Sequence, residues 1–253
     1  MGSRLAGPAH CLHRDFEPVG VAQGWSPESY AASVESLQDL GYSRIAMGGL
    51  IAQRTDEISQ VLTAVSEVRE PDVRLHLLGV TRCERMPEFA TYGVTSFDST
   101  SPFRQAFKDD RDNYYTPEGA CVALRVPQVE GNAKLQRRIR AGEIDHNLAR
   151  RLEQTALKVL ASFDLGEADI DTAVEALRAY ETLHDEKRNR SETYRAVLEA
   201  APWKDCGCEI CSSVGIQVII FRGTERNKRR GFHNLYVFSK RLEREFATGG
   251  PRV

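Results

Sequence analysis

The sequence predicts an α/β protein in which a parallel β-sheet is followed by a helical segment and a small cysteine-rich subdomain. In the first hundred residues, short apolar runs alternate with amphipathic stretches, which predicts parallel strands joined by right-handed crossovers. From about residue 131 the apolar residues recur at helical spacing, and further on three cysteines cluster within six residues. Hydrophobic residues make up 41% of the 253 residues, which is enough for a packed core.

The first hundred residues are expected to form four strands separated by helices. The predicted strands are 19–23, 45–47, 75–80 and 94–97, with a short helix at 87–91 before the last. Ser26 is the predicted N-cap of the first helix, with Pro27 at the first helical position and Gly41 at the end of the helix. Thr55 is the predicted N-cap of a second helix, which ends at Pro71.

Glycines and polar residues follow directly after these strands. In a (β/α)8 TIM-type barrel, the chemistry occurs at that carboxyl end of the strands. Four strands are about half of such a barrel, and an open half-barrel would expose the edges of its sheet. We therefore expect a partial TIM-type barrel, either because the chain is N-terminally incomplete or because something else covers the edge.

The rest of the chain predicts a helical insertion and a terminal subdomain. Segment 131–201 indicates two or three helices, which either contact a substrate or only pack as a lobe with a solvated charged face. A strand at 216–221, a basic loop and a helix at 232–246 are expected after it. The predicted domains are the barrel units at 1–128, the insertion at 129–201 and the metal-binding subdomain at 202–253.

Four residues near the C-terminus have the spacing of metal ligands. Cys206, Cys208 and Cys211 precede His233 in the pattern Cys-x-Cys-x2-Cys-x21-His, and Gly207 allows a tight turn between the first two. Three thiolates and one imidazole fill the tetrahedral coordination of zinc and leave no open position, so the pattern predicts a structural zinc site. The alternative is a set of buried cysteines. Cys83 and Cys121 are isolated, as is Cys11.

Two further motifs follow predicted strands. Asp98 ends the fourth strand, where a carboxylate is placed for covalent attack on an anomeric carbon; its alternative role is to cap the following loop. Gly48 and Gly49 precede Leu50 after the second strand, and two glycines let a flat ligand lie against backbone amides. A plain strand-to-helix turn explains these glycines equally well.

Composition limits the partners. The net charge of −2 gives no general attraction to nucleic acid, so such binding requires a local patch. The basic run that contains Arg226, Lys228, Arg229 and Arg230 is one candidate, and a solvated loop is its alternative. No apolar run approaches the roughly 20 residues that span a bilayer, and no signal peptide is recognised, so neither a membrane nor secretion is expected. Six cysteines with one cluster favour a reducing, cytoplasmic location.

Taken together, these motifs resemble those of the tRNA-guanine transglycosylase superfamily, in the same order. The matching segments are Val21-Ala22-Gln23-Gly24, Gly48-Gly49-Leu50, Leu78-Gly79-Val80, Ser96-Phe97-Asp98 with Pro102 and Arg104, and the Cys206, Cys208, Cys211 and His233 set. They resemble the family's base-recognising Gln-Gly strand, its Gly-Gly-Leu loop, its Met-Gly-Val strand end, its Phe-Asp-Cys…Pro-Thr-Arg nucleophile segment and its zinc signature.

The resemblance implies late barrel strands and a base-exchange reaction. Asp98 would attack C1′ of a nucleoside and expel guanine, and a 7-deazaguanine such as preQ0 would replace it. Zinc would be the cofactor, and no organic cofactor is implied. The implied base pocket consists of Gln23, Gly24, Gly48, Gly49, Leu50 and Gly79. The implied nucleic-acid contacts are Arg104, Arg226, Lys228, Arg229 and Arg230.

Two features set the chain apart from the tRNA-directed enzymes. The link between Asp98 and Cys206 is far longer than theirs, and segment 23–30 looks more like the branch that modifies DNA. DNA is therefore favoured over tRNA as substrate, with tRNA as the alternative. The family's early strands and second catalytic aspartate have no counterpart here. A second alternative is consequently a non-catalytic zinc-bearing subunit or fragment, which binds nucleic acid or a full-length partner. The protein partners expected for the chain are a second copy of itself or a barrel-completing chain.

Overall fold

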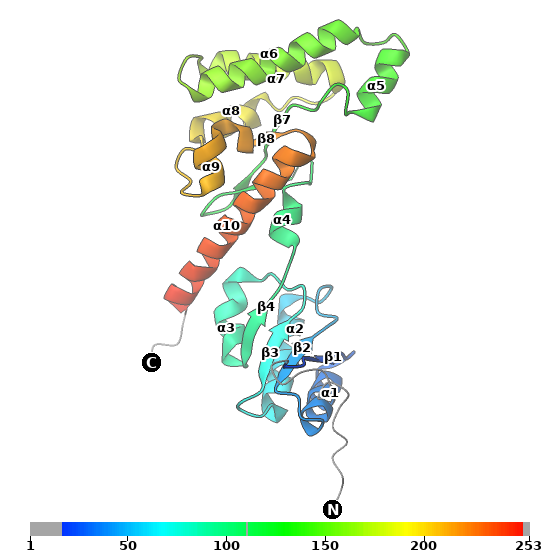
Figure 1. The fold of residues 1–253 in the computed structure, drawn as a ribbon, viewed down its shortest axis with the longest axis vertical. Coiled ribbons are helices and arrows are strands. Elements are labelled where there is room, and N and C mark those ends of the chain that lie inside the picture. The colour runs from blue at the N-terminus through cyan, green and yellow to red at the C-terminus, as the bar shows by residue number, and fades with distance from the viewer. Residues whose placement is uncertain (1–16, 110, 250–253) are drawn as a thin grey trace, which may run out of the picture. The chain divides into compact units, whose positions relative to one another are not determined.

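The computed structural model describes residues 17–109 and 111–249, which fall into two compact units (Figure 1). The first unit comprises the described residues up to Ser101 together with those from Arg241 onward. The second unit is Pro102–Lys240. The boundary by packing therefore lies near residue 101, whereas the sequence placed the end of the barrel units at 128.

The first unit is an α/β layer with one parallel sheet. Its elements are β1 (Gly20–Ala22), α1 (Pro27–Asp39), β2 (Arg44–Met47), α2 (Thr55–Val68), β3 (Arg74–Leu77), the 3₁₀ helix η2 (Cys83–Arg85), α3 (Met86–Thr91) and β4 (Val94–Phe97). The strands are ordered β1-β2-β3-β4, and each neighbouring pair is parallel. This confirms the predicted α/β class and parallel sheet. Within the described residues no fifth strand joins this sheet, so a closed barrel is not observed.

Local sequence signals explain where the first two helices begin. Ser26 caps α1, with its side chain accepting from the amide of Ser29, as predicted. The prediction that Thr55 caps α2 was wrong by one residue. Thr55 is the first helical residue, and the N-cap is Arg54, whose amide donates to the side chain of Glu57 at 2.6 Å.

The two faces of this sheet differ in character. On one face, apolar strand residues pack with α1, α2 and α3 in a single core that includes Ile45, Leu75 and Phe89. On the other face, Val21 of β1 is 54% exposed, and His76 of β3 lies in register with the exposed Ser96 of β4. The helices therefore cover one side of the sheet and leave partly polar side chains on the other.

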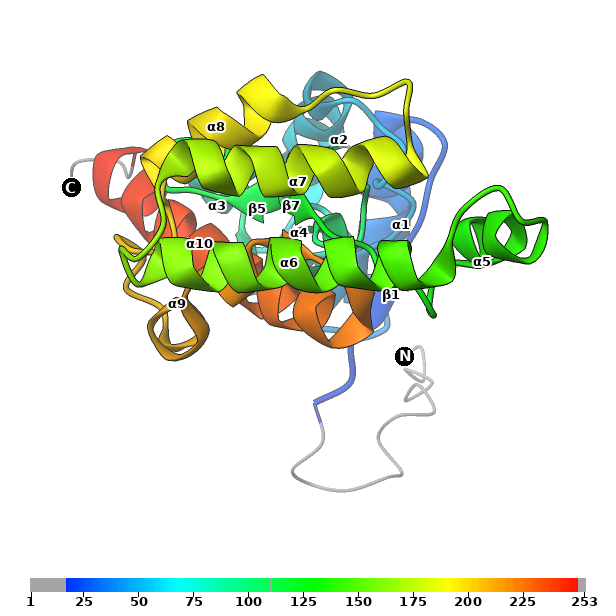
Figure 2. The ribbon, with the colours of Figure 1, turned by 90° about the horizontal axis from the view of Figure 1, so that it is seen from above.

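The second unit is mostly helical. Its elements are α4 (Ser101–Gln105, whose first residue belongs to the first unit), β5 (Tyr114–Tyr115), β6 (Ala120–Cys121), β7 (Leu124–Arg125), α5 (Ala133–Arg140), α6 (His146–Asp164), α7 (Ile170–His184), α8 (Ser191–Ala200), α9 (Glu209–Val214), the 3₁₀ helix η3 (Gly215–Val218), β8 (Ile220–Phe221) and α10 (Gly223–Gly249, which enters the first unit at Arg241). α6 and α7 run side by side along this unit (Figure 2).

The helical prediction for 131–201 is confirmed, with four helices where two or three were expected. One hydrophobic core joins them to the cysteine-bearing segment, because Leu160 of α6 and Leu177 of α7 belong to the same cluster as Cys208 and Cys211. Packing thus unites the predicted insertion and the predicted metal-binding subdomain. Among the described residues, no helix combines the length and the apolar character needed to cross a membrane.

Two predictions near the C-terminus were wrong. The strand expected at 216–221 is a 3₁₀ helix followed by the two residues of β8, which pair in parallel with β7. The basic run is not a loop, because α10 already begins at Gly223 instead of near Phe232. The arginines of this run therefore lie on successive turns of a helix, and their environments alternate with its period.

Candidate active site and metal centre

The carboxyl end of the parallel sheet brings several predicted site residues together. Asp98 directly follows β4, and its Oδ1 accepts a hydrogen bond from the amide of Gly79, which follows β3, at 2.8 Å. The Asp98 side chain as a whole is 61% exposed. The hydrogen bond from Gly79 fixes one carboxylate oxygen of a side chain that a ligand can reach.

His76 is a neighbour of Asp98 that the sequence analysis missed. Its Nε2 lies 3.5 Å from Asp98 Oδ1, and its Nδ1 lies 2.8 Å from the hydroxyl oxygen of Ser96. A single histidine inside an apolar run gives no motif to recognise. The parallel register that places β3 beside β4 is what brings it to the carboxylate.

The two glycines after β2 lie against side chains of the segment that follows β1. A Cβ atom on Gly48 would lie 3.1 Å from Nε2 of Gln23, so the glutamine side chain rests on this glycine. Gly49 has a φ of +79°, and a Cβ there would lie 2.9 Å from the hydroxyl of Tyr30, which donates to the carbonyl of Gly48 at 2.8 Å. Glycine is needed at 49 both for the backbone angle and for this close approach.

The remaining predicted pocket residues differ in exposure. Leu50 is fully buried in the core, and a Cβ on Gly24 would clash with the backbone amide of Tyr30 at 2.8 Å. The structure thus places Gln23 and Gly48 in contact and Gly79 against Asp98.

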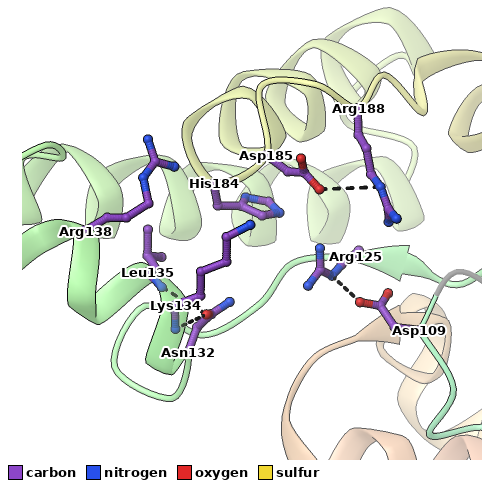
Figure 3. Close-up of a pocket in the computed structure, with 9 residues that line it drawn as sticks. All are labelled: Asp109, Arg125, Asn132, Lys134, Leu135, Arg138, His184, Asp185 and Arg188. Atoms are coloured by element: carbon purple, nitrogen blue, oxygen red, sulfur yellow. Dashed lines mark hydrogen bonds and ion pairs between the residues drawn. The ribbon is translucent and has the colours of Figure 1, made fainter.

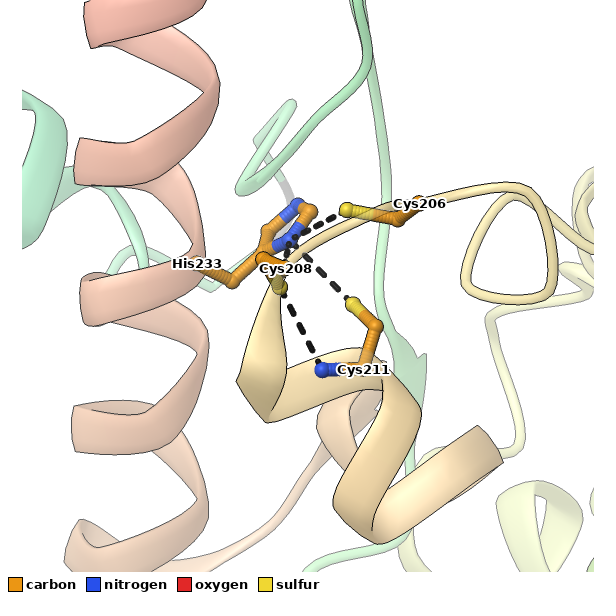
Figure 4. A group of neighbouring side chains, drawn as sticks. All are labelled: Cys206, Cys208, Cys211 and His233. Carbon is orange, nitrogen blue, oxygen red and sulfur yellow. Dashed lines mark hydrogen bonds between the residues drawn. The ribbon is translucent and has the colours of Figure 1, made fainter.

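Cys206, Cys208, Cys211 and His233 form one compact cluster (Figure 4). The three Sγ atoms lie 3.5, 3.6 and 3.3 Å from Nδ1 of His233, in that order. Metal bonds of about 2.3 Å to sulfur and 2.0–2.1 Å to nitrogen at a tetrahedral angle require separations of about 3.5 Å. The donor atoms are therefore already spaced for one tetrahedral metal ion.

Surrounding contacts orient the four side chains. His233 Nε2 lies 2.8 Å from the carbonyl of Tyr115, which requires a hydrogen on Nε2 and leaves the Nδ1 lone pair for a metal. The ring of Tyr114 stacks on His233 with centroids 4.0 Å apart, and its hydroxyl contacts Cys211 Sγ at 3.3 Å. Cys208 caps α9, with its sulfur accepting from the amide of Cys211. A hydrogen bond from Cys211 lowers the pKa of Cys206 to about 4, which favours a thiolate ligand.

Arg230 was predicted to contact nucleic acid, and the structure contradicts this. Its side chain is fully buried and donates to the carbonyls of Ala106, Val218 and Ile220 and to Oδ1 of Asn227. Burial lowers the pKa of Arg230 to about 10. This arginine ties α10 to the segments around it and presents nothing to solvent.

The other predicted basic contacts are more accessible. Lys228 and Arg229 are exposed on α10, and Lys228 pairs with Glu225 at 2.9 Å. Arg226 is partly buried, which lowers its pKa to about 10. Arg104 is exposed on α4. A role in nucleic-acid binding remains a prediction for these four residues.

The sequence is similar to those of known base-exchange enzymes. It is 45% identical over 232 residues to a DNA-guanine transglycosylase of Salmonella montevideo, a match that covers 90% of this chain and 56% of that protein. It is 33% identical over 133 residues to a queuine tRNA-ribosyltransferase of Chromohalobacter salexigens and 31% over 127 residues to one of Xylella fastidiosa. These two matches cover 51% and 47% of this chain and 34% and 32% of the relatives. No protein-family model matches, and the chain spans about half or less of the length of these relatives.

Proposed function

We propose that the chain carries the nucleophile and the zinc subdomain of a base-exchange glycosyltransferase. The chain is related to the tRNA-guanine transglycosylase superfamily, and the DNA-guanine transglycosylase matches nine-tenths of its length. The proposed reaction replaces guanine in DNA with a 7-deazaguanine such as preQ0. One observation supports it most: an exposed carboxylate at the carboxyl edge of a parallel sheet, held by a backbone amide. In (β/α) enzymes this edge is where catalytic groups lie.

In the proposed mechanism the Asp98 carboxylate attacks C1′ of an unstacked deoxyguanosine. The C1′–N9 bond breaks, and guanine leaves with the electron pair and takes up a proton. N9 of the incoming 7-deazaguanine, having lost its proton, then attacks C1′ and releases the carboxylate. Two inversions at C1′ retain the configuration of the sugar. Gln23, Gly24, Gly48, Gly49, Leu50 and Gly79 would shape the base pocket.

The metal of the cysteine cluster is proposed to be zinc. The donor spacing fits a tetrahedral ion, and three sulfurs with one nitrogen are a set that zinc prefers. All four positions are supplied by the protein, so the ion would hold α9 to α10 and would not contact the reacting sugar. Binding a metal there stabilises the folded second unit.

A partial barrel is the proposed architecture of the first unit. Its four parallel strands and one-sided helical cover match half of a (β/α)8 barrel. Catalysis would then require the other half, supplied by further sequence, a second copy or a partner chain. If none of these three supports exchange, the non-catalytic zinc-bearing alternative is favoured.

The test combines this chain with the barrel half of its relatives, joined or mixed, and offers labelled guanine or preQ0 with DNA and, separately, with tRNA. We expect incorporation into DNA and a loss of several orders of magnitude in Asp98→Asn, which keeps the shape but removes the anionic nucleophile. Ser99→Ala, one residue further along, is the matched control and should retain activity. Normal incorporation by Asp98→Asn would refute the nucleophile, and labelling of tRNA alone would reverse the preference for DNA.

A further inference from the structure

The second unit contains a polar cavity of about 250 Å³ outside the sites described above. It lies at the start of α5, the end of α7 and the loop that follows it, beside β7 (Figure 3). Its charged lining consists of Arg125, Lys134, Arg138 and Arg188 together with Asp109 and Asp185. Arg125 pairs with Asp109 and Arg188 with Asp185, at 3.0 and 3.5 Å, and Arg138 pairs with Glu143 outside the lining. Lys134 adds a positive charge that no ion pair balances among the described residues, so the cavity favours an anion.

A buried histidine gives the cavity its second chemical feature. His184 is 6% exposed, and its Nδ1 lies 2.7 Å from the carbonyl of Tyr180. A carbonyl can only accept, so Nδ1 carries the hydrogen and Nε2 holds a lone pair. Among the described residues this buried Nε2 has no hydrogen-bond partner. Burial lowers the pKa of His184 to about 4, so at neutral pH this atom accepts a hydrogen bond and does not donate one.

Two cations lie close to this acceptor. Lys134 and Arg125 act electrostatically on His184, and Figure 3 shows both charged ends turned toward its ring. Arg125 pairs with Asp109 at 3.0 Å, whereas the ammonium of Lys134 has no ion pair or hydrogen bond within the described chain. The guanidinium of Arg138 turns away from the imidazole and is bound to Glu143.

The ligand must therefore combine an anion with a hydrogen-bond donor. A phosphodiester satisfies the cations but carries no proton at neutral pH, so it cannot donate to Nε2. The N–H groups of a nucleobase can. The elements that line the cavity carry further positive charge, because Arg137 and Arg140 of α5 and Lys187 after α7 are exposed and have no ion-pair partner in the described part of the chain. Exposed cations of this kind fit a backbone with several phosphates.

We propose that this cavity binds one unpaired nucleotide of the nucleic-acid substrate, with its phosphate on Lys134 and Arg125 and a base N–H donating to Nε2 of His184. Unpairing is required because the acceptor is buried, so the edge of the base must enter the cavity. The identity of the strand rests on the proposed function, but binding can be measured without any base exchange.

The test measures binding of the full chain to a single-stranded DNA octamer over a series of salt concentrations. Lys134→Gln should weaken binding about fivefold and reduce the slope of log K against log salt by about 0.7, the value for one phosphate contact on a single strand. Lys158→Gln removes the same charge from an exposed site on α6 that does not line the cavity, and it should change neither quantity. His184→Asn can keep an amide donor for the Tyr180 carbonyl, but its shorter side chain leaves no acceptor at the position of Nε2, so it should weaken binding and leave the slope unchanged.

An octamer of abasic sites and inorganic phosphate complete the experiment. The abasic strand should bind wild type more weakly than the intact strand and should not respond to His184→Asn. Equal effects of Lys134→Gln and Lys158→Gln would overturn the proposal, as would equal affinity for both strands. Inorganic phosphate that competes at the affinity of the octamer would instead indicate a small-phosphate site. If base exchange fails while these binding results are obtained, the proposed function is refuted and the nucleotide site is supported. If His184→Asn does not fold, the comparison of Lys134→Gln with Lys158→Gln tests the proposal.

Discussion

At the scale of single residues, the orientation of Asp98 depends on a glycine. The carboxylate accepts its hydrogen bond from the amide of Gly79, whose φ is +73°. An alanine at this position would strain the backbone, and its Cβ would lie 2.5 Å from Cδ1 of Ile51. Ile51 is 69% exposed, so its side chain can move aside, but the backbone strain would remain.

We therefore expect Gly79→Ala to destabilise the first unit by about 1–2 kcal/mol, the cost of a left-handed alanine, and to lower any exchange activity of a complemented enzyme at least tenfold. Gly41→Ala is the control. Its φ is +86° with no atom within 4 Å of the new Cβ, so it has the same backbone cost away from Asp98. Denaturant unfolding measures stability. Equal activity of the two variants would show that the amide of Gly79 does not position the carboxylate.

The buried arginine on α10 leads to a second prediction. Arg230→Met leaves the carbonyls of Ala106 and Ile220 without their donor, and an unpaired buried acceptor costs about 1–3 kcal/mol. We expect a loss of at least about 2 kcal/mol in the free energy of unfolding. Arg229→Met, on the exposed face of the same helix, should stay within about 0.5 kcal/mol. A stable Arg230→Met with weakened DNA binding would restore the original prediction that this arginine contacts nucleic acid.

At the scale of elements, the cluster of three cysteines and His233 joins α9 to α10. Cys208 and Cys211 are buried in the same core as the helices α6 to α8, so loss of the ion should affect the whole second unit. We expect one zinc per chain by elemental analysis and a melting temperature that falls by many degrees in excess chelator. Cys208→Ser should lose the metal, whereas Cys121→Ser, outside the cluster, should keep it. Protein that contains no zinc and melts normally in chelator would contradict this prediction.

The elements also show which features the sequence could predict. The cluster of three cysteines and one histidine could be predicted because four side chains of the right chemistry recur at a fixed spacing. The place of Asp98 could be predicted because it directly follows a strand, whereas its catalytic role stays a prediction. The burial of Arg230 was not predicted, because the final helix was expected to begin near Phe232 and this arginine was placed in a loop before it. Once α10 is extended to Gly223, its buried positions Asn227, Arg230 and His233 follow the helical period of three to four residues. His76 required the register of β3 against β4, which no local pattern contains.

At the scale of the whole molecule, the first unit has an unpaired side. The two outer strands of its sheet, β1 and β4, each have one neighbour among the described residues, and Val21 is exposed on the face without helices. In a (β/α)8 barrel that face points inward, and the outer strands pair with further strands. The proposed partial barrel therefore requires a complementary half that covers this face.

The last prediction tests this open face with a charge. Val21→Lys should leave the stability of the free chain within about 0.5 kcal/mol, because the side chain is already 54% exposed. The same lysine should prevent association with a complementary barrel half, because it would then be buried without a partner. Leu40→Lys, 51% exposed just after α1, is the control and should associate normally. Association is measured by sedimentation and by the rise in melting temperature on mixing. If Val21→Lys associates as well as Leu40→Lys, the open face is not the interior of a barrel.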